Sequence, residues 1–478
     1  MSLRQTVMSG LRWSAGMRLL GQLLTWTSTL IVIRLLSPGD YGLMSMAGVF
    51  IAFLSMISEM GLGTAIVQRR DLGDNDLRAI FGFAILVTLV ICCILIISAP
   101  AVSRFYGEPE LVPILRVLSL IFVFSVFSVV PSSLLLKDLE YKKFAAVQFA
   151  GAIAGSACTL PMALLGFGVW SLVCGFLAVR IGVLVGVLIA RPYLRFPTLR
   201  LKGMGPVFLY SGQVTSARIL WYLAASAAAT LIIGRVLGSE LLGIYAVGLT
   251  LAALPMEKVG GILNAVAFPA FSSVQGDPNL AGAHFLRAVR ILCLITVPVF
   301  FGISSVSTEI VAVFLGDRWL QAVVPLQIIA VMVPLRMVKN LSAPALMGMG
   351  RADVFLTNEV LAVVMMPLGF LVGSQWGVVG VSLVWMIVFP VVATINLFKT
   401  TRVLDLTLVD VGHQVSRSLL SGLVMYLFVV VSREFACTDD SVILNMLTLI
   451  SVGAVVYFGM TMAINRSTMR EAIGLVRS

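Results

Sequence analysis

Charged side chains are scarce in this 478-residue chain, in which Asp, Glu, Lys and Arg together make up 12% of the residues. Soluble domains carry roughly 25% charged residues, so a soluble globular protein is excluded. The chain has only two histidines, His284 and His413, and six cysteines without metal-ligand spacing. We therefore expect no histidine-based catalytic site, no metal, no cofactor and no disulfide framework. A P-loop is also missing from the sequence, so we do not expect the chain to hydrolyse ATP.

Apolar runs of about 20 residues dominate the sequence, and 59% of its residues are hydrophobic. Such runs are long enough to cross a bilayer as helices, and they do not alternate in polarity as barrel strands would. The sequence therefore predicts an all-α, polytopic membrane protein with about 14 transmembrane helices. The expected spans are 14–36, 41–66, 79–101, 113–135, 144–164, 168–190, 206–235, 241–268, 288–314, 323–347, 354–373, 377–398, 414–432 and 441–464.

Lys and Arg are distributed unevenly between the two sets of loops. About 21 of them fall in the loops on the side of the N-terminus. The opposite loops hold only Arg34, Arg104, Arg235, Arg318 and Arg433. The positive-inside rule then places both termini in the cytoplasm. It also explains most of the net charge of +11, so we expect no nucleic acid partner.

The chain carries a long internal repeat. The stretch RLLSPGDYGLMSM, Arg34–Met46, begins a pattern that returns about 200 residues later. The matched positions are Arg34 with Arg235, Leu36 with Leu237, Gly42 with Gly243, Val112-Pro113 with Val324-Pro325, Leu136–Phe144 with Met347–Phe355, and Ser171-Leu172-Val173 with Ser382-Leu383-Val384. An even number of spans in each copy gives two parallel six-helix repeats. We expect repeats at 1–200 and 201–400, with two extra helices and a cytoplasmic tail at 401–478.

Eleven ionisable residues fall inside the expected spans. Seven are basic and four acidic: Arg18, Arg116, Arg180, Arg218, Lys258, Arg336 and Lys339, and Glu59, Glu257, Glu309 and Glu359. Each buried charge costs roughly 2.5–3.5 kcal/mol on insertion scales. We therefore expect most of them to face an aqueous cavity or a partner. Glu309 and Arg116 lie near span ends and are expected to reach the interface instead.

The spacing of polar residues predicts a polar stripe on the first helix of each repeat. Ser14, Arg18, Gln22, Thr25 and Thr29 recur at helical spacing in the first copy, and Ser211, Thr215, Arg218, Tyr222 and Ser226 in the second. Two interpretations remain open for these stripes. They line a cavity with Arg18 and Arg218, or they form helix–helix contacts through hydroxyl and amide groups.

Further candidates for the cavity wall are Arg336, Lys339 and Arg180. Arg336 and Lys339 share one helix face, so their charges repel unless Glu359 or a bound anion lies between them. Arg180 lies in mid-span among glycines, and it either lines the cavity or makes a structural pair.

The acidic residues Glu59, Glu257 and Glu359 leave a similar choice. Each is either a proton or sodium site or a counterion for a neighbouring basic residue.

The N-terminal motifs resemble those of a known family. SGLRW at Ser9–Trp13, RLLSPGDYGLMSM, and GLGTAIVQRRD at Gly61–Asp71 resemble the signature of Wzx-type polysaccharide flippases, with most similarity to the exopolysaccharide subset. This family belongs to the multidrug/oligosaccharidyl-lipid/polysaccharide exporter superfamily. The resemblance implies two six-helix bundles in a V, a cationic central cavity and alternating access.

The resemblance also implies a substrate and a setting. The substrate would be an oligosaccharide linked to undecaprenyl pyrophosphate, flipped across the bacterial inner membrane for exopolysaccharide or lipopolysaccharide assembly. Family members are expected to meet membrane lipids and to work with a polysaccharide polymerase and export machinery. They are transporters and not enzymes.

Three alternatives compete with this interpretation. A cation-coupled drug exporter of the same superfamily would favour acidic residues, whereas seven basic residues stand here against four acidic ones. A membrane-embedded enzyme of polysaccharide assembly would usually need a sizeable outer loop, which the sequence does not predict. A lipid II flippase is the third alternative, and the sequence does not separate it from the first interpretation.

Overall fold

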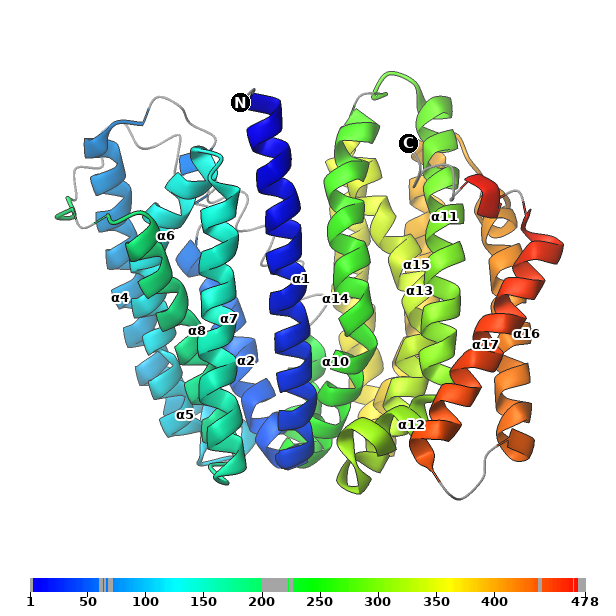
Figure 1. Ribbon diagram of the computed structural model, residues 1–478, viewed down its shortest axis with the longest axis horizontal. Coiled ribbons are helices and arrows are strands. Elements are labelled where there is room, and N and C mark those ends of the chain that lie inside the picture. The colour runs from blue at the N-terminus through cyan, green and yellow to red at the C-terminus, as the bar shows by residue number, and fades with distance from the viewer. Residues whose placement is uncertain are drawn as a thin grey trace. The chain divides into compact units, whose positions relative to one another are not determined.

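The computed structural model describes residues 3–59, 63, 66–67, 72–193, 195–198, 222, 227–272, 274–436, 441–466 and 468–471. All regular elements in this part of the chain are helices (Figure 1). Among the described residues, eleven segments are long and apolar enough to cross a membrane, and one of them, Asp353–Val403, contains two helices. The chain is therefore a multi-pass, all-α membrane protein, as predicted. The span expected at 206–235 lies mostly outside the described residues.

The chain divides into two compact units, Met1–Gly243 and Ile244–Ser478. The first unit contains α1 (Leu3–Leu35), α2 (Pro38–Glu59), α4 (Asp74–Tyr106), α5 (Leu111–Leu118), α6 (Leu120–Lys137), α7 (Tyr141–Leu164) and α8 (Val169–Ala190). The chain then enters α10 (Ala228–Ser272), which is broken at Gly238, where φ is 82°. The second unit begins beyond this break, at Ile244. The repeat boundaries 1–200 and 201–400 remain predictions.

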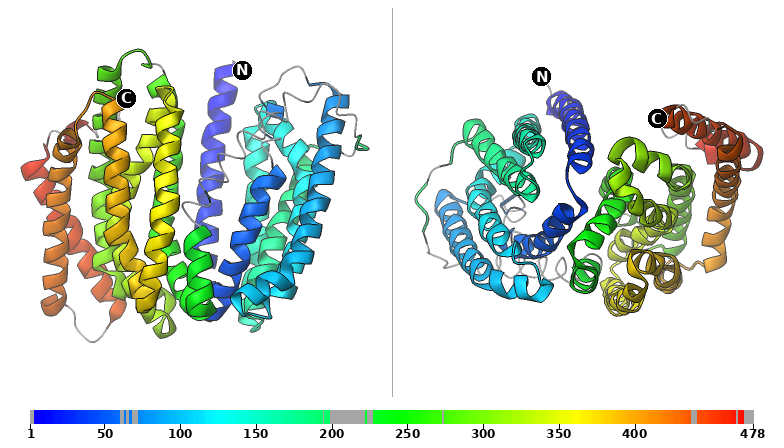
Figure 2. Two further views of the ribbon diagram at one scale, coloured as in Figure 1. Left: turned by 180° about the vertical axis from the view of Figure 1, so that it is seen from behind. Right: turned by 90° about the horizontal axis from the view of Figure 1, so that it is seen from below.

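The second unit continues through a further set of helices. These are α11 (Pro278–Ser305), α12 (Ser307–Ile310), α13 (Val323–Gly348), α14 (Ala352–Gly373), α15 (Gly377–Val403), α16 (Leu408–Ala436) and α17 (Val442–Ile464). The last two helices form a hairpin at the edge of the unit (Figure 2). Two expected spans are interrupted in the structure. The span 113–135 divides into α5 and α6 at Ser119, and the span 288–314 ends as a continuous helix at Ser305.

The repeat predicted from the sequence has a structural counterpart in the turns after α6 and α13. Leu139 and Gly350, which the sequence aligns, both have left-handed φ values, 58° and 74°. The residue after each donates its backbone N–H to the carbonyl five positions earlier, from Glu140 to Leu135 and from Arg351 to Leu346, at 2.8 Å in both cases. This Schellman-type closure satisfies the last carbonyls of each helix.

Glycines allow α7 and α8 to approach closely in the first unit. A Cβ on Gly175 would lie 1.8 Å from Thr159 Oγ1, and one on Gly151 would lie 2.6 Å from Val183. In a bilayer the hydrophobic effect does not drive helices together, so close packing of small residues stabilises such pairs instead.

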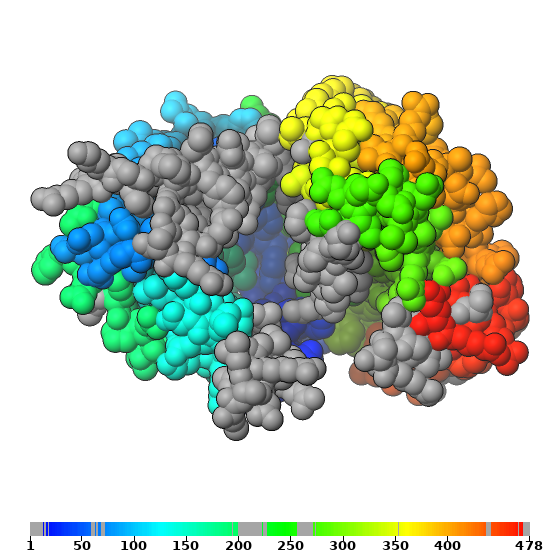
Figure 3. Space-filling model, turned by 90° about the horizontal axis from the view of Figure 1, so that it is seen from above, coloured from blue at the N-terminus to red at the C-terminus, as the bar shows by residue number. Residues whose placement is uncertain are grey.

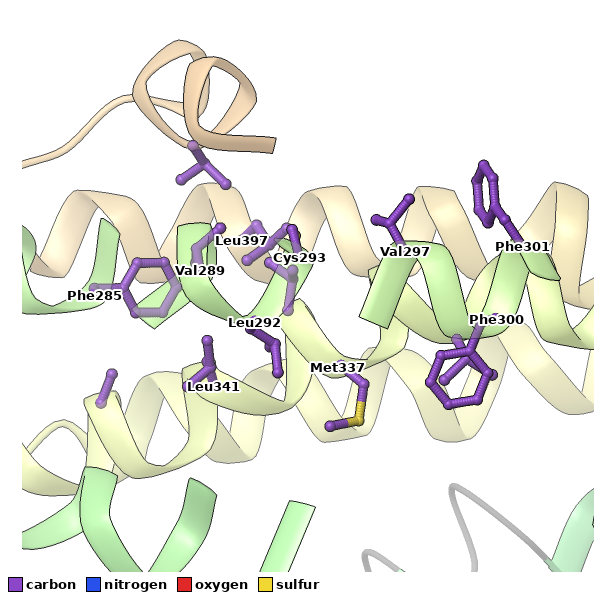
Figure 4. Close-up of a cluster of buried hydrophobic side chains, with 14 of the residues drawn as sticks. Phe285, Val289, Leu292, Cys293, Val297, Phe300, Phe301, Met337, Leu341 and Leu397 are labelled. Carbon is purple, nitrogen blue, oxygen red and sulfur yellow. The ribbon is translucent and has the colours of Figure 1, made fainter. Parts of the chain in front are cut away.

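The core of the second unit lies along α11. Phe285, Val289, Leu292, Cys293 and Phe300 of α11 pack with residues of α13 and α15, including Met337, Leu341 and Leu397 (Figure 4). The side chains of Arg287 and Arg290 at the start of α11 form ion pairs with Glu471 near the C-terminus. Figure 3 shows these two segments in contact. The C-terminal segment after α17 is thereby tied to the first turns of α11.

Candidate functional site

Lys339 and Glu359 form an ion pair inside the second unit. Lys339 lies on α13 and Glu359 on α14, with 2.6 Å between Nζ and Oε1. Their side chains are 12% and 9% exposed. In a buried pair of this kind the two opposite charges neutralise each other. Removing either partner would leave an unpaired charge in a medium of low polarity, which is costly. Of the two counterions considered for Lys339, the structure shows Glu359. Lys339 is thus half of an ion pair and not a free cation.

Arg336 has a different environment, although it lies only one turn from Lys339. Its guanidinium carbon is 5.0 Å from the centre of the Trp385 ring on α15. Within the described part of the chain, no carboxylate forms an ion pair with Arg336. Its side chain is partly exposed and lies near the middle of the 26-residue α13. A cation at this depth without a carboxylate can accept an anionic ligand.

Trp385 is held rigidly beneath Arg336. Its indole N–H donates a hydrogen bond of 2.8 Å to the hydroxyl oxygen of Tyr245 on α10. The rings of Phe370 and Phe389 lie 6.2 and 5.5 Å from its own. Both Trp385 and Tyr245 are almost fully buried. An aromatic face in contact with a guanidinium stabilises the charge without consuming its hydrogen-bond donors. Those donors thus remain available to a ligand.

Arg180 lies on α8 in the first unit and is partly exposed. It forms no ion pair with any carboxylate in the described ranges. The same helix approaches α7 through Gly175 and Gly182. Arg180 therefore shares with Arg336 the absence of a described counterion. Arg180 belongs to the first unit and Arg336 to the second.

The other predicted site residues lie beyond what the structure describes. Arg218 is outside the described residues altogether. Arg18 lies on α1, Glu59 at the end of α2 and Glu257 on α10, but their side chains are outside the described part. The roles assigned to these four residues remain predictions.

Part of the polar stripe on α1 lines a cavity. Thr25 and Thr29 face a space of about 300 Å³ enclosed by α1, α2, α7 and α8 of the first unit. Ser28, Ser156 and Thr159 contribute further hydroxyl groups to its wall. The lining of this space includes neither Arg18 nor Arg218, so the role of the stripe in a cationic cavity remains a prediction. The wall is otherwise mainly apolar and includes the side chains of Tyr41 and Phe176.

The expectation that Glu309 reaches the interface is wrong. Its side chain is 9% exposed and forms an ion pair of 2.9 Å with Arg433 at the end of α16. Arg433 also donates a hydrogen bond to the Ser305 carbonyl oxygen. From the sequence we expected Arg433 in a loop. The packing of α16 against α11, which brings Arg433 to Glu309, cannot be predicted from hydrophobic periodicity. Arg116 is exposed, in agreement with its expected place near a helix end.

Sequence reasoning also missed Trp385 and Tyr245 as parts of the Arg336 site. Both are aromatic residues in apolar runs, where aromatic side chains usually form ordinary core. The only available signal was the position of Trp385 directly after the repeated Ser382-Leu383-Val384 motif.

Comparisons with known proteins agree with this architecture. The model of the family described as polysaccharide biosynthesis protein matches residues 31–324. The lipopolysaccharide biosynthesis protein WzxC of Escherichia coli (strain K12) is 27% identical over 394 residues, covering 81% of this chain and 79% of WzxC. The succinoglycan biosynthesis transport protein ExoT of Rhizobium meliloti (strain 1021) is 22% identical over 450 residues, covering 94% of this chain and 91% of ExoT.

Among solved structures, the lipid II flippase MurJ in an inward closed conformation aligns with a TM-score of 0.70. The alignment covers 95% of this chain and 99% of that chain at 14% sequence identity, so it shows a shared fold. The family model covers more than half of the chain. The chain therefore belongs to the polysaccharide biosynthesis protein family.

Proposed function

We propose that this protein flips an oligosaccharide linked to undecaprenyl pyrophosphate from the cytoplasmic to the outer leaflet of a bacterial inner membrane. The glycan would serve exopolysaccharide or lipopolysaccharide assembly, and both termini would be cytoplasmic. Family membership supports the class of substrate, since WzxC and ExoT are named for polysaccharide biosynthesis and transport. The observation in the structure that carries the proposal is Arg336, a mid-helix cation without a described carboxylate partner.

The physical requirement is a polar route for an anion through roughly 30 Å of hydrocarbon. A pyrophosphate diester carries about two negative charges and loses hydration when it enters the protein. Charge-assisted, bidentate hydrogen bonds from a guanidinium replace part of that hydration. Arg336 can supply such bonds because the Trp385 ring stabilises its charge, and an indole has no acceptor atom for the guanidinium N–H groups. In this proposal Arg18, Arg218 and Arg180 supply further positive charge along the route.

The described acidic residues argue against export of organic cations. Glu359 is paired with Lys339 and Glu309 with Arg433, so neither carboxylate is free to bind a cationic drug. Lipid II is also an undecaprenyl pyrophosphate-linked saccharide, and Arg336 would suit it equally well. We favour the polysaccharide precursor because the family model and the relatives above belong to polysaccharide biosynthesis.

The decisive experiment measures flipping by the purified protein in liposomes. A fluorescent lipid-pyrophosphate-linked oligosaccharide is placed in both leaflets, and its accessibility to a membrane-impermeant quencher is followed over time. We expect rapid exchange with the unmodified protein. Arg336→Gln should slow this exchange at least about tenfold, because a hydrogen bond to a charged group contributes roughly 1.5–3 kcal/mol.

Arg402→Gln is the matched control. Arg402 also lies over an aromatic ring, Phe398 at 4.2 Å, but it is exposed near the end of α15. The Arg402→Gln protein should exchange the glycolipid at the rate of the unmodified protein. Equal rates for all three proteins would remove Arg336 from the proposed site. Failure of the unmodified protein to move several such glycolipids would refute the flippase proposal itself.

A further inference from the structure

A second polar hollow lies at one end of the first unit, at the ends of its membrane-spanning helices. It has a volume of about 440 Å³ and is lined by the first turn of α4, the end of α6 and the segment that follows α8. Its lining residues are Asp74, Leu77, Leu134, Arg191, Pro192, Tyr193 and Arg195. Figure 1 shows the start of α4 at the same end of the unit as the start of α1. The distribution of Lys and Arg assigns this end to the cytoplasm.

The segment after α8 is fixed in place against α4. Arg78 of α4 donates from Nε to the Phe196 carbonyl oxygen at 2.9 Å, and the Thr198 N–H donates to the Arg78 carbonyl oxygen at 3.1 Å. Gly82 permits this approach, since a Cβ there would lie 2.3 Å from the Thr198 carbonyl oxygen. These contacts hold Arg195 at the rim of the hollow without a ligand.

The arginines of the hollow are only partly satisfied. Arg195 lies 4.0 Å from Asp74, well beyond the 2.7–2.9 Å of a charge-assisted hydrogen bond. Arg191 is paired with Asp138 through one nitrogen, and a guanidinium has five N–H donors. Arg78 also acts on Tyr193, so three arginines stand against the two carboxylates Asp74 and Asp138 around the hollow.

Tyr193 provides an independent sign that a polar partner is missing. Its ring packs edge-to-face on Phe81 with centroids 6.2 Å apart. Its hydroxyl is buried and has no hydrogen-bond partner among the residues that the structure describes. Burial and the nearby Asp74 raise the pKa of this hydroxyl, while Arg195 and Arg78 oppose the increase. The hydroxyl is therefore a protonated donor close to Arg195 and Arg78, and a buried donor without a partner is costly.

We propose that this hollow binds the phosphodiester headgroup of an anionic phospholipid from the cytoplasmic leaflet. The phosphate would accept hydrogen bonds from Arg195, Arg191 and the Tyr193 hydroxyl. Leu77, Leu134 and Pro192 offer apolar surface to the glycerol and the first methylenes of the acyl chains. Basic pockets between membrane helices on the cytoplasmic side commonly hold anionic headgroups. The hollow is formed by helix ends of the first unit, whereas Arg336 lies in mid-helix in the second unit, so different residues form the two proposed sites.

Native mass spectrometry of the detergent-purified protein tests the proposal. The protein is incubated with phosphatidylglycerol or phosphatidylcholine, and retained lipid is counted per molecule. We expect selective retention of phosphatidylglycerol and at least fivefold less of it in Arg195→Gln and Arg191→Gln. Tyr193→Phe keeps the ring packing and should lose about threefold, the effect of one hydrogen bond.

Lys143→Gln is the control for general charge. Lys143 lies at the same end of the unit and is 53% exposed, but it pairs with Glu140 outside the hollow. An equal loss in Lys143→Gln and Arg195→Gln would mean unspecific attraction and would overturn the proposal. If millimolar inorganic phosphate competes for the hollow and the protein retains no lipid, the hollow binds free phosphate. Preferred retention of a polyprenyl pyrophosphate would assign it to the transported lipid. Neither result requires transport, so the flippase proposal stands or falls separately.

Discussion

At the scale of single residues, neighbouring charges on one helix face have different partners. Arg336 and Lys339 are one turn apart, yet Arg336 contacts an aromatic ring and Lys339 a carboxylate. The helical spacing predicted the shared face correctly. The partners could not be predicted, because Trp385 and Glu359 reach α13 from two other helices whose packing is set by the tertiary fold.

The ion pair of Lys339 and Glu359 leads to a test of its role. Glu359→Gln should leave Lys339 as an uncompensated charge and lower the free energy of unfolding by about 3 kcal/mol, in the range for breaking buried pairs. The double variant Lys339→Gln/Glu359→Gln should regain most of this loss, because no charge remains unpaired. The measurement is thermal unfolding in detergent. A double variant as unstable as the single one would show that the pair acts through packing. Loss of flipping in a stable double variant would return Lys339 to the binding site.

At the scale of the helices, the close contact of α7 with α8 depends on glycine residues, which have no side chain. Gly175→Ala should lower the melting temperature, because the new methyl group would overlap Thr159 Oγ1. Gly186→Ala is the matched control in the same helix, since its Cβ would meet Val147 at an ordinary 3.4 Å. Replacing a helical glycine by alanine there should be neutral or stabilising by up to about 1 kcal/mol.

The combined variant Gly175→Ala/Thr159→Ala separates steric overlap from other causes. Removal of the Thr159 hydroxyl makes room for the methyl group, so stability should recover in part. If the combined variant unfolds as early as Gly175→Ala alone, the contact between α7 and α8 is not limited by this overlap.

Helix positions were predictable because long apolar runs have few alternatives in a bilayer, where the backbone must satisfy its own hydrogen bonds. The repeat was predictable at its turns, and Leu139 and Gly350 show why. Equivalent backbone geometry is kept at both positions even though only one is glycine. The hollow at Arg191 and Arg195 could not be predicted, since it depends on where an irregular segment folds back onto α4. The cost of burying a charge marked Arg336 as a candidate for the site, but its neighbours Trp385 and Tyr245 could not be predicted from the sequence.

At the scale of the whole molecule, the proposed function couples transport to the membrane potential through the negative charge of the substrate. An inside-negative potential favours outward movement of an anion by roughly 2.3 kcal/mol per charge per 100 mV. No dedicated ion site is required for this, and both described intramembrane acids, Glu309 and Glu359, are occupied by basic partners. The potential alone could therefore bias transport toward the outer leaflet.

Proteoliposomes with potassium diffusion potentials of graded size would measure this coupling. The outward rate of a lipid-pyrophosphate-linked oligosaccharide should rise as the interior becomes more negative. The same glycan on a lipid monophosphate carries about half the charge, so its rate should depend on potential with about half the slope. Equal slopes for the two lipids would mean that charges of the protein, and not of the substrate, move through the field. A rate that does not depend on the potential but depends on a sodium or proton gradient would instead require an ion site. Glu59 and Glu257 are the remaining candidates for such a site. They are the predicted intramembrane acids whose side chains lie outside the described part of the chain.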